Sequence, residues 1–382
     1  MPIGLYIHFP FCLKKCLYCD FNSAASTVAV RAEYPKLLLK EMELRQALLP
    51  APVRSGTLYF GGGTPSLMTP GQVGSLIEAA VARFGLEPDA EVTLEANPGT
   101  LTPATLAGYR AAGVNRISLG IQSFEDRLLE LLGRVHSKEE ALSAFDAARA
   151  AGFDNISIDL MHSLPGQSPR QWREALARAI ALSPEHISAY ALSVEDATPF
   201  AELFEAGRLP LPEEDEAAEM FEATAEVLEG AGYLHYEISN FARPGRSSRH
   251  NGAYWNRTSY LGFGAGAHSF WNDNGLGERW CNAEAADEYR EAIAAGRIPQ
   301  REREALTLDQ AISECFFLGL RVLSPGLDLA ALETLYGNEA LAPRLAEVER
   351  LVESGALKRE GRRVRLAPES VIVANSIFSR FL

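Results

Sequence analysis

Long hydrophobic runs are missing from this 382-residue sequence. No stretch approaches the roughly 20 consecutive apolar residues that a helix needs to span a bilayer. The first residues lack a basic segment, an extended apolar core and a small-residue cleavage site, so we expect neither a secretion signal nor a membrane span. These absences predict a cytoplasmic protein.

An excess of positive charge is also missing, because 36 Lys and Arg residues face 50 Asp and Glu residues and give a net charge of −14. A protein with this overall charge is not attracted to phosphate backbones, so we expect no nucleic-acid partner. Hydrophobic residues make up 47% of the chain, which is enough apolar material for a core. The composition is that of an ordinary globular protein.

Cysteine is scarce, and its distribution is uneven. The chain has five cysteines, and three of them lie within eight residues. An odd number with this spacing favours metal binding in a reducing compartment over a disulfide framework. Cys315 lies in an apolar pattern of helical period, which predicts a buried thiol. Cys281 gives no clear signal.

Strand-like and helix-like segments alternate up to about residue 200, which predicts βαβ units around a parallel sheet. The expected strands are 5–9, 57–60, 91–95, 116–120, 156–160 and 186–192. The expected helices between them are 34–49, 70–84, 103–111, 138–150 and 169–181. Six βα units are fewer than the eight of a closed barrel, so we predict an α/β fold built on a partial (β/α)6 barrel.

The alternation of strands and helices stops after this region. We predict a barrel domain over 1–205 and a region over 206–300 that completes the barrel and carries an aromatic-rich stretch. The segment 301–382 reads as helices and a short β-pair, which predicts a smaller C-terminal α+β, winged-helix-like domain. Its acidic context argues against DNA binding.

Three cysteines, Cys12, Cys16 and Cys19, form a CxxxCxxC motif directly after the first expected strand. A [4Fe-4S] cluster has four irons, so three thiolates leave one iron free to chelate the amino and carboxylate groups of S-adenosylmethionine (SAM). A structural zinc site is the alternative, and His8 could complete it. Zinc usually takes four ligands from paired Cys or His motifs, however, and no second pair is present. The motif therefore predicts a cluster with SAM.

Polar or flexible groups also follow the later strands. The run Gly61–Pro65 follows the second expected strand, where backbone N–H and C=O groups could hold the methionyl end of SAM. Glu95, Gln122 and Asp159 lie at the ends of later strands, where they are expected to ring the barrel mouth. Arg134 could pair with a carboxylate of SAM or of a porphyrin. Singly, each could be a capping or solvated residue.

A last motif, His250-Asn-Gly-Ala-Tyr-Trp255, lies beyond the barrel. Histidine is a common axial haem ligand, and Tyr254 and Trp255 offer flat apolar surface to a porphyrin. On spacing alone, a His-Asn turn followed by core aromatics is the favoured interpretation of the segment. His268 is a second candidate ligand with weaker support.

Taken together with Tyr6–Cys12, these motifs resemble the coproporphyrinogen-oxidase-like branch of radical SAM proteins. That branch includes the oxygen-independent coproporphyrinogen III oxidase and the HemW family of haem chaperones. The chain resembles HemW because Phe21 stands where the oxidase has an additional cysteine, and because Cys12 leaves no room for the oxidase's N-terminal extension. The segment 250–255 also matches the HNxxYW motif that HemW proteins use for haem.

The resemblance implies Cys12, Cys16 and Cys19 as cluster ligands and His250 as the haem residue, on the C-terminal side of the barrel mouth. The implied SAM contacts are Tyr6, Tyr18, Gly62, Gly63, Thr64, Glu95, Gln122, Arg134 and Asp159. His268 stands where the oxidase's SAM-binding pattern has an aliphatic residue.

The implied function is a haem chaperone that binds haem and the cluster and hands haem to acceptor apoproteins, without coproporphyrinogen oxidase activity. The alternative is the oxidase itself, which makes porphyrin by oxidative decarboxylation. The resemblance names neither the haem acceptor nor the electron donor.

Overall fold

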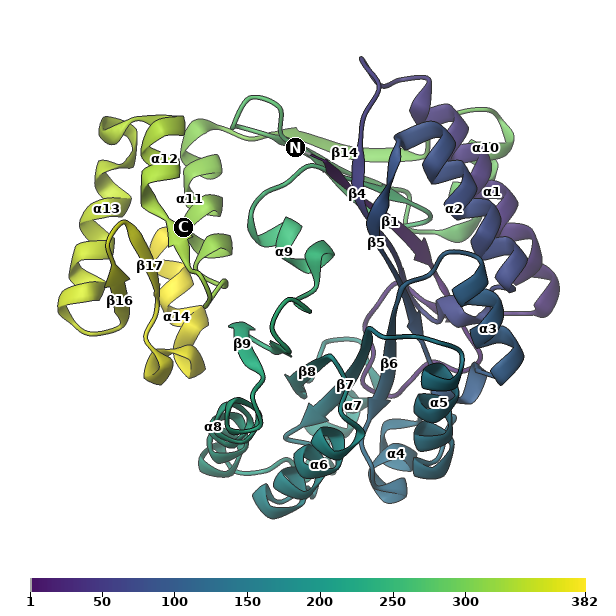
Figure 1. The fold of residues 1–382 in the computed structure, drawn as a ribbon, viewed down its shortest axis with the longest axis horizontal. Helices are drawn as coiled ribbons and strands as arrows, with labels where there is room; N and C mark the ends of the chain where they lie inside the picture. The colour runs from purple at the N-terminus through teal and green to yellow at the C-terminus, as the bar shows by residue number, and fades with distance from the viewer. Residues whose placement is uncertain (1) are drawn as a thin grey trace.

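Six parallel strands form the centre of the structure, a computed structural model that describes residues 2–382 (Figure 1). They are β1 (Ile3–Phe9), β4 (Ser55–Gly62), β5 (Leu86–Ala96), β6 (Arg116–Gln122), β7 (Ile156–His162) and β8 (His186–Ala191). Each strand pairs in parallel with the next in this order. All six correspond to predicted strands, and the open (β/α)6 barrel is confirmed.

Helices connect these strands and cover their outer face (Figure 1). They are α1 (Val28–Gln46), α2 (Pro70–Phe84), α3 (Pro103–Ala111), α4 (Asp126–Leu132), α5 (Lys138–Ala150), α6 (Pro169–Leu182), α7 (Pro199–Glu205) and α8 (Glu214–Gly230). Thr69, Thr102, Ser137 and Ser168 begin four of them with reciprocal capping boxes. α1 begins earlier than predicted, because Thr27 caps it and Pro35 is accommodated inside it.

The strands alternate between apolar and polar side chains, which divides the sheet into two faces. Leu94, Leu119 and Ile158 are fully buried in the core beneath the helices. Their neighbours Glu95 and Asp159 point the other way, because successive side chains of a strand face opposite sides. The inner face of β4 to β8, which we call the barrel interior, is therefore polar.

Further strands extend the sheet at both edges, and the sequence analysis did not resolve them. They are β11 (Tyr260–Phe263), β12 (His268–Trp271), β13 (Glu278–Asn282) and β14 (Gln300–Ala305) beside β1, and β10 (Asn240–Ala242) and β9 (Leu234–Glu237) beside β8. β11 is parallel to β1, whereas the later pairs are antiparallel. Strands of three to six residues carry too little periodicity to be recognised.

A second hydrophobic core belongs to the C-terminal part of the chain. Its elements are α11 (Leu308–Gly319), α12 (Leu329–Tyr336), α13 (Asn338–Glu353), α14 (Ala374–Phe378), and the small sheet of β15 (Leu327–Asp328), β17 (Arg363–Leu366) and β16 (Leu357–Glu360). Cys315 is buried in α11, as predicted. None of the helices in residues 2–382 is long and apolar enough to cross a membrane.

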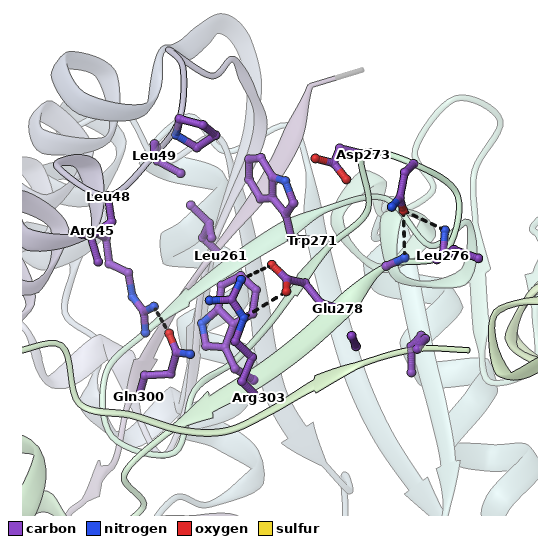
Figure 2. A pocket seen from close by; sticks show the side chains of 16 residues that line it. Arg45, Leu48, Leu49, Leu261, Trp271, Asp273, Leu276, Glu278, Gln300 and Arg303 are labelled. Atoms are coloured by element: carbon purple, nitrogen blue, oxygen red, sulfur yellow. Dashed lines mark hydrogen bonds and ion pairs between the residues drawn. The ribbon is translucent and has the colours of Figure 1, made fainter. Parts of the chain in front are cut away.

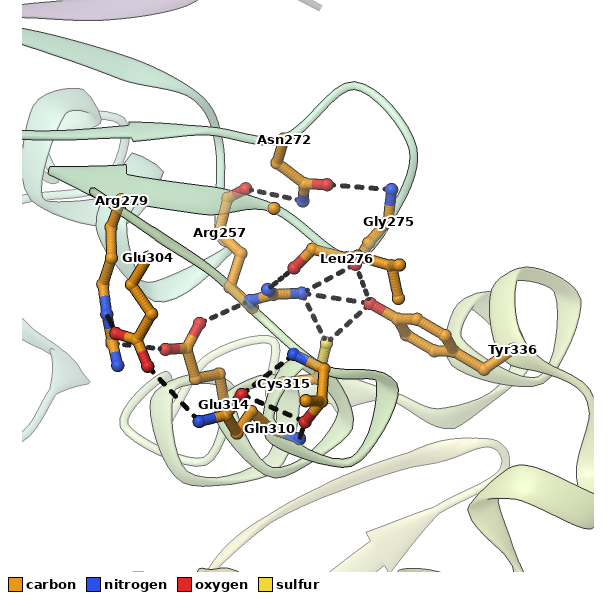
Figure 3. A network of polar contacts seen from close by, with 12 residues as sticks. Arg257, Asn272, Gly275, Leu276, Arg279, Glu304, Gln310, Glu314, Cys315 and Tyr336 are labelled. Carbon is orange, nitrogen blue, oxygen red and sulfur yellow. Dashed lines mark hydrogen bonds and ion pairs between the residues drawn. The ribbon is translucent and has the colours of Figure 1, made fainter.

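A polar network, which we call the C-terminal interface, joins the sheet extension to α11 and α12 (Figure 3). Arg257 is at its centre and is 5% exposed. Its guanidinium donates to Glu314 Oε2 at 3.0 Å, the Leu276 carbonyl at 2.6 Å and the Tyr336 hydroxyl at 3.0 Å. Arg279 of β13 pairs with the other Glu314 oxygen at 2.8 Å. The buried charges of the interface are therefore compensated.

Candidate metal and cofactor site

A cavity of about 350 Å³ opens at the carboxyl ends of the central strands. The three clustered cysteines lie at this cavity together with most of the residues expected to contact SAM. Those expected contacts are Tyr18, Gly62, Gly63, Thr64, Glu95, Gln122, Arg134 and Asp159. The structure therefore brings together residues from separate βα units, as their common position at strand ends predicted.

The cysteine loop begins at β2 (Phe11–Cys12), which pairs with β3 (Ala24–Ala25). All three thiols are free and half-buried. The Thr64 hydroxyl donates to Cys12 Sγ at 3.4 Å, and Arg134 Nη1 donates to Cys16 Sγ at 3.5 Å. These contacts tie two of the three cysteines to the segment after β4 and to the segment after α4.

The residues of this loop fit an iron–sulfur cluster better than a zinc ion. Within residues 2–382, no group of three His, Cys, Asp or Glu side chains could share one metal ion. His8 does not complete a zinc site, because its ring nitrogens bond to the Tyr6 hydroxyl at 3.1 Å and the Asn22 carbonyl at 2.9 Å. A cubane instead binds each cysteine at a different iron, so its ligands need not meet at one point.

The glycine run after β4 is hydrogen-bonded to the segment that leads into the cysteine loop. Gly63 donates its N–H to the Phe9 carbonyl, and Thr64 donates to the Phe11 carbonyl, both at 2.9 Å. A Cβ on Gly63 would lie 2.7 Å from the Phe11 carbonyl oxygen, so only glycine allows this close contact. The Gly62 N–H bonds to Glu95 at 3.3 Å. These three N–H groups therefore already have partners within the protein.

Two carboxyl groups line the cavity, and burial raises the pKa of each. Glu95 accepts hydrogen bonds from the Tyr59 hydroxyl at 2.8 Å and from Gly62. Burial raises the pKa of Glu95 to about 7 despite these bonds. Asp159 accepts two contacts from the Ser118 hydroxyl, at 3.1 and 3.0 Å, and burial raises its pKa as well. Both groups can accept hydrogen bonds from a ligand's hydroxyl or amino groups when they are ionised.

Gln122 reaches the cavity through strained backbone. Its φ is +66°, in the left-handed region that side-chain-bearing residues rarely adopt. The pairing of β6 with β7 shifts between Gly120 and Gln122, so the final residue of β6 leaves the regular alternation. Arg134 Nη2 bonds to the Gly120 carbonyl at 2.6 Å and holds the same turn. Strain of this kind concentrates at functional sites.

Tyr6 is the one expected SAM contact that does not line the cavity. The cavity contains other residues that the sequence analysis missed: Tyr59, Arg116, Ser118, Ser188, Tyr190 and Asn251. Most of them lie on a predicted strand, two or more residues before its end, and their side chains share a face with the residue at that end. The period-two pattern could have identified them, because residues i and i−2 of a strand share a face.

His250 lies elsewhere than predicted. It is 2% exposed in α9 (Arg249–Trp255), and its ring nitrogens bond to Thr57 Oγ1 at 2.7 Å and the Tyr254 hydroxyl at 2.9 Å. Thr57 lies near the start of β4, so the ring sits in the N-terminal half of the barrel and not at its C-terminal mouth. α9 lies between β4 and α11 and contacts both (Figure 1).

The surroundings of His250 keep it neutral. Burial lowers its pKa to about 3, and the Arg116 charge acts in the same direction. Glu91 accepts the backbone N–H groups of Arg249 and His250 at 3.0 Å each and so caps α9. His268 is exposed on β12 and does not line the cavity.

A second cavity, of about 470 Å³, lies between the end of α1 and the β11–β14 extension (Figure 2). It shares no lining residue with the first cavity. Arg303 pairs with both oxygens of Glu278, at 2.9 and 2.6 Å, and Arg45 donates to Gln300 at 3.1 Å. The two arginines of this cavity therefore already have partners within the protein.

Two family models match the chain: the radical SAM superfamily at residues 6–179 and the HemN C-terminal domain at residues 306–372. The haem chaperone HemW of Bacillus subtilis (strain 168) is 37% identical over 99% of this chain and 98% of that protein. The mitochondrial radical S-adenosyl methionine domain-containing protein 1 of Mus musculus is 35% identical over 99% of this chain and 87% of that protein.

A solved structure with a similar fold is coproporphyrinogen III oxidase (HemN) from Escherichia coli, a radical SAM enzyme. It matches with a TM-score of 0.84 and covers 100% of this chain and 90% of its own. The sequence identity is 24%, so the likeness establishes the fold alone.

Proposed function

This chain belongs to the HemW family of radical SAM proteins, and we propose on that premise that it is a cytoplasmic chaperone that binds haem and delivers it to acceptor proteins. The observation that carries the proposal is the identity of 37% with the haem chaperone of Bacillus subtilis over nearly the whole of both chains. The HNxxYW motif at 250–255 supports it.

Membership in the radical SAM superfamily implies a [4Fe-4S] cluster and SAM. We assign the cluster to Cys12, Cys16 and Cys19, because these thiols lie together at the cavity. The cluster, when bound, supplies one-electron reducing chemistry to SAM. Arg134 would orient SAM beside the loop, while Glu95 and Asp159 would accept hydrogen bonds deeper in the cavity.

Haem binding is assigned to His250 on the strength of the motif. The neutral imidazole is the form that ligates iron, and the low pKa of His250 keeps the ring neutral. Both ring nitrogens are engaged, so coordination requires that the bond to Thr57 or to Tyr254 breaks. Breaking the bond to Thr57 would require α9 to move against β4, whereas breaking the bond to Tyr254 would require a change within α9 alone.

A haem titration tests this assignment. We expect His250→Ala to alter the Soret spectrum, because it removes a coordinate bond, and Trp255→Ala mainly to weaken affinity by removing apolar contact. Tyr254→Phe should leave the Soret band unchanged and bind haem at least as tightly, because it frees Nε2. His268→Ala tests the second candidate ligand and should leave both the affinity and the Soret band unchanged. An unchanged affinity and Soret band in His250→Ala would show that another residue ligates the iron.

The oxidase alternative is tested by anaerobic incubation of the reconstituted protein with coproporphyrinogen III, SAM and reductant. We expect no protoporphyrinogen IX, because Phe21, 63% exposed beside the cysteine loop, replaces the additional cysteine. The remaining cysteines, Cys281 and Cys315, do not line the cavity. Turnover of even a few equivalents would reverse the ranking of the two functions.

We also propose the division of the chain into 1–205, 206–300 and 301–382 as units. Two hydrophobic cores, one in the barrel and one in the C-terminal part, support the last boundary. Limited proteolysis tests it: cleavage near residue 300 should release a stable C-terminal fragment.

A further inference from the structure

Arg116 is a buried arginine without a protein partner. It is 2% exposed and lies at the start of β6, with its side chain lining the cavity that holds the cysteines. Within residues 2–382, its Nε has no hydrogen-bond partner and no carboxylate oxygen lies within 4.0 Å of its guanidinium. Burying a charge is costly unless it is paired, so this arrangement needs an explanation.

The nearby carboxylates do not supply the missing partner. Glu91 gives one oxygen to each of the first two N–H groups of α9. Glu95 is bonded to Tyr59 and Gly62, and Asp159 is bonded to Ser118. None of these carboxylates forms an ion pair or a hydrogen bond with Arg116 in residues 2–382. The positive charge of Arg116 is left facing the cavity.

Asn251 provides a second, independent observation on the opposite element. It belongs to the HNxxYW segment, and its side chain lines the same cavity. Its backbone N–H bonds to Ser248 Oγ at 3.3 Å, but its side-chain amide has no hydrogen-bond partner in the part of the chain that the structure describes. The cavity therefore receives a free guanidinium from β6 and a free carboxamide from α9.

We propose that Arg116 and Asn251 form a carboxylate-binding subsite in the barrel interior. A guanidinium matches the two oxygens of a carboxylate in plane, and a carboxamide adds a further donor. A singly charged carboxylate fits better than a doubly charged phosphate, because Glu95 and Asp159 line the same cavity. The subsite is distinct from the cysteine side, where Arg134 is bonded to Cys16 and Gly120.

The carboxylate has two chemical sources, a propionate of haem or a free small carboxylic acid. The assignment to a haem propionate rests on the proposed function. The subsite itself is inferred only from the residues that line the cavity. Arg116 lies at the start of β6, in the same half of the barrel as His250, so haem on His250 would have its propionates in the half of the barrel that holds the subsite.

The first experiment uses the full, cluster-loaded chain with sodium propionate and with propionamide, its neutral analogue. Propionate should raise the thermal midpoint of the unmodified protein, and propionamide should not. Arg116→Gln should weaken propionate binding by about tenfold or more, and Asn251→Ala should weaken it less. If Arg116→Gln does not fold, Asn251→Ala still tests the subsite, because it removes the second donor and leaves the buried charge in place.

Arg45→Gln is the matched control, because Arg45 is also buried but donates to Asn282 at 2.7 Å and to Gln300. This variant should lose stability and keep the propionate effect. Equal propionate effects in the unmodified protein, Arg116→Gln and Asn251→Ala would overturn the proposal and leave Arg116 as a merely solvated side chain.

The second experiment compares haem with its dimethyl ester, in which both propionates are masked. If a propionate occupies the subsite, the unmodified protein should prefer haem, and Arg116→Gln should bind both forms equally. If Arg116→Gln loses the stabilisation by free propionate but binds haem and its dimethyl ester as the unmodified protein does, the natural ligand is a small free acid. That result still supports the subsite. If the unmodified protein binds neither porphyrin, the proposed haem function fails, and the propionate result decides the subsite by itself.

Discussion

The barrel interior and the C-terminal interface both bury arginine, but they treat it in opposite ways. Each guanidinium nitrogen of Arg257 in the C-terminal interface meets an acceptor from another element (Figure 3). Arg116 in the barrel interior meets none in residues 2–382. Satisfied polar networks hold elements together, whereas an unsatisfied buried group lowers stability and is retained where a ligand completes it. The difference separates the structural region from the binding region.

The largest contrast between the two regions should come from their cysteines. Cys12→Ala removes one of only three clustered thiolates, so iron and sulfide content after anaerobic reconstitution should fall to background. Cys315→Ala in the C-terminal interface should leave both contents unchanged, because Cys315 contacts Arg257 and Tyr336 within that interface. Stoichiometric zinc in place of iron in the unmodified protein would contradict the cluster assignment.

The next effect concerns Arg257. Arg257→Met strands the Glu314 carboxylate and several carbonyl groups, and should lower the free energy of unfolding by about 3–5 kcal/mol. Urea unfolding measures this change. Arg170→Met is the control, because Arg170 is exposed on α6 and should change stability by less than about 0.5 kcal/mol. A similarly small effect at Arg257 would mean that the interface does not depend on its charge network.

A smaller effect should appear in the pH dependence of stability. The folded-state pKa of Glu95 is about 7, above its ordinary value of 4.5, so its contribution is full below pH 4.5 and is lost as pH rises to 7. Glu95→Gln should leave stability unchanged near pH 5 and raise it at pH 8, by an amount on the order of 2 kcal/mol. Urea midpoints at the two pH values measure this, with exposed Glu219→Gln as the control. Equal changes in the urea midpoint of Glu95→Gln at both pH values would contradict the raised pKa of Glu95.

The smallest effect concerns the contact between β4 and the HNxxYW segment. Thr57→Val keeps the shape of the side chain but removes the hydroxyl that bonds to His250, and should cost about 1 kcal/mol. Thr334→Val, on an exposed turn of α12, is the control for the substitution itself. An increase in haem affinity in Thr57→Val would sharpen the assignment, because it would show that release of His250 limits binding.

Local sequence was sufficient to predict the βα units, the cysteine loop and the family. Strand and helix periods, capping residues and the CxxxCxxC spacing are local signals, and each acts within one segment of chain. The positions of Glu95, Gln122 and Asp159 were predictable for a related reason, because parallel strands present their carboxyl ends to one place.

The surroundings of those residues, in contrast, depend on tertiary packing. Thr57 and His250 are 193 residues apart, and nothing in either segment indicates their hydrogen bond. The same holds for the pairing of β11 with β1, the commitment of the glycine N–H groups and the isolation of Arg116. A residue's type sets which bonds it can make, but whether a partner is present depends on packing between distant segments, which local sequence does not encode.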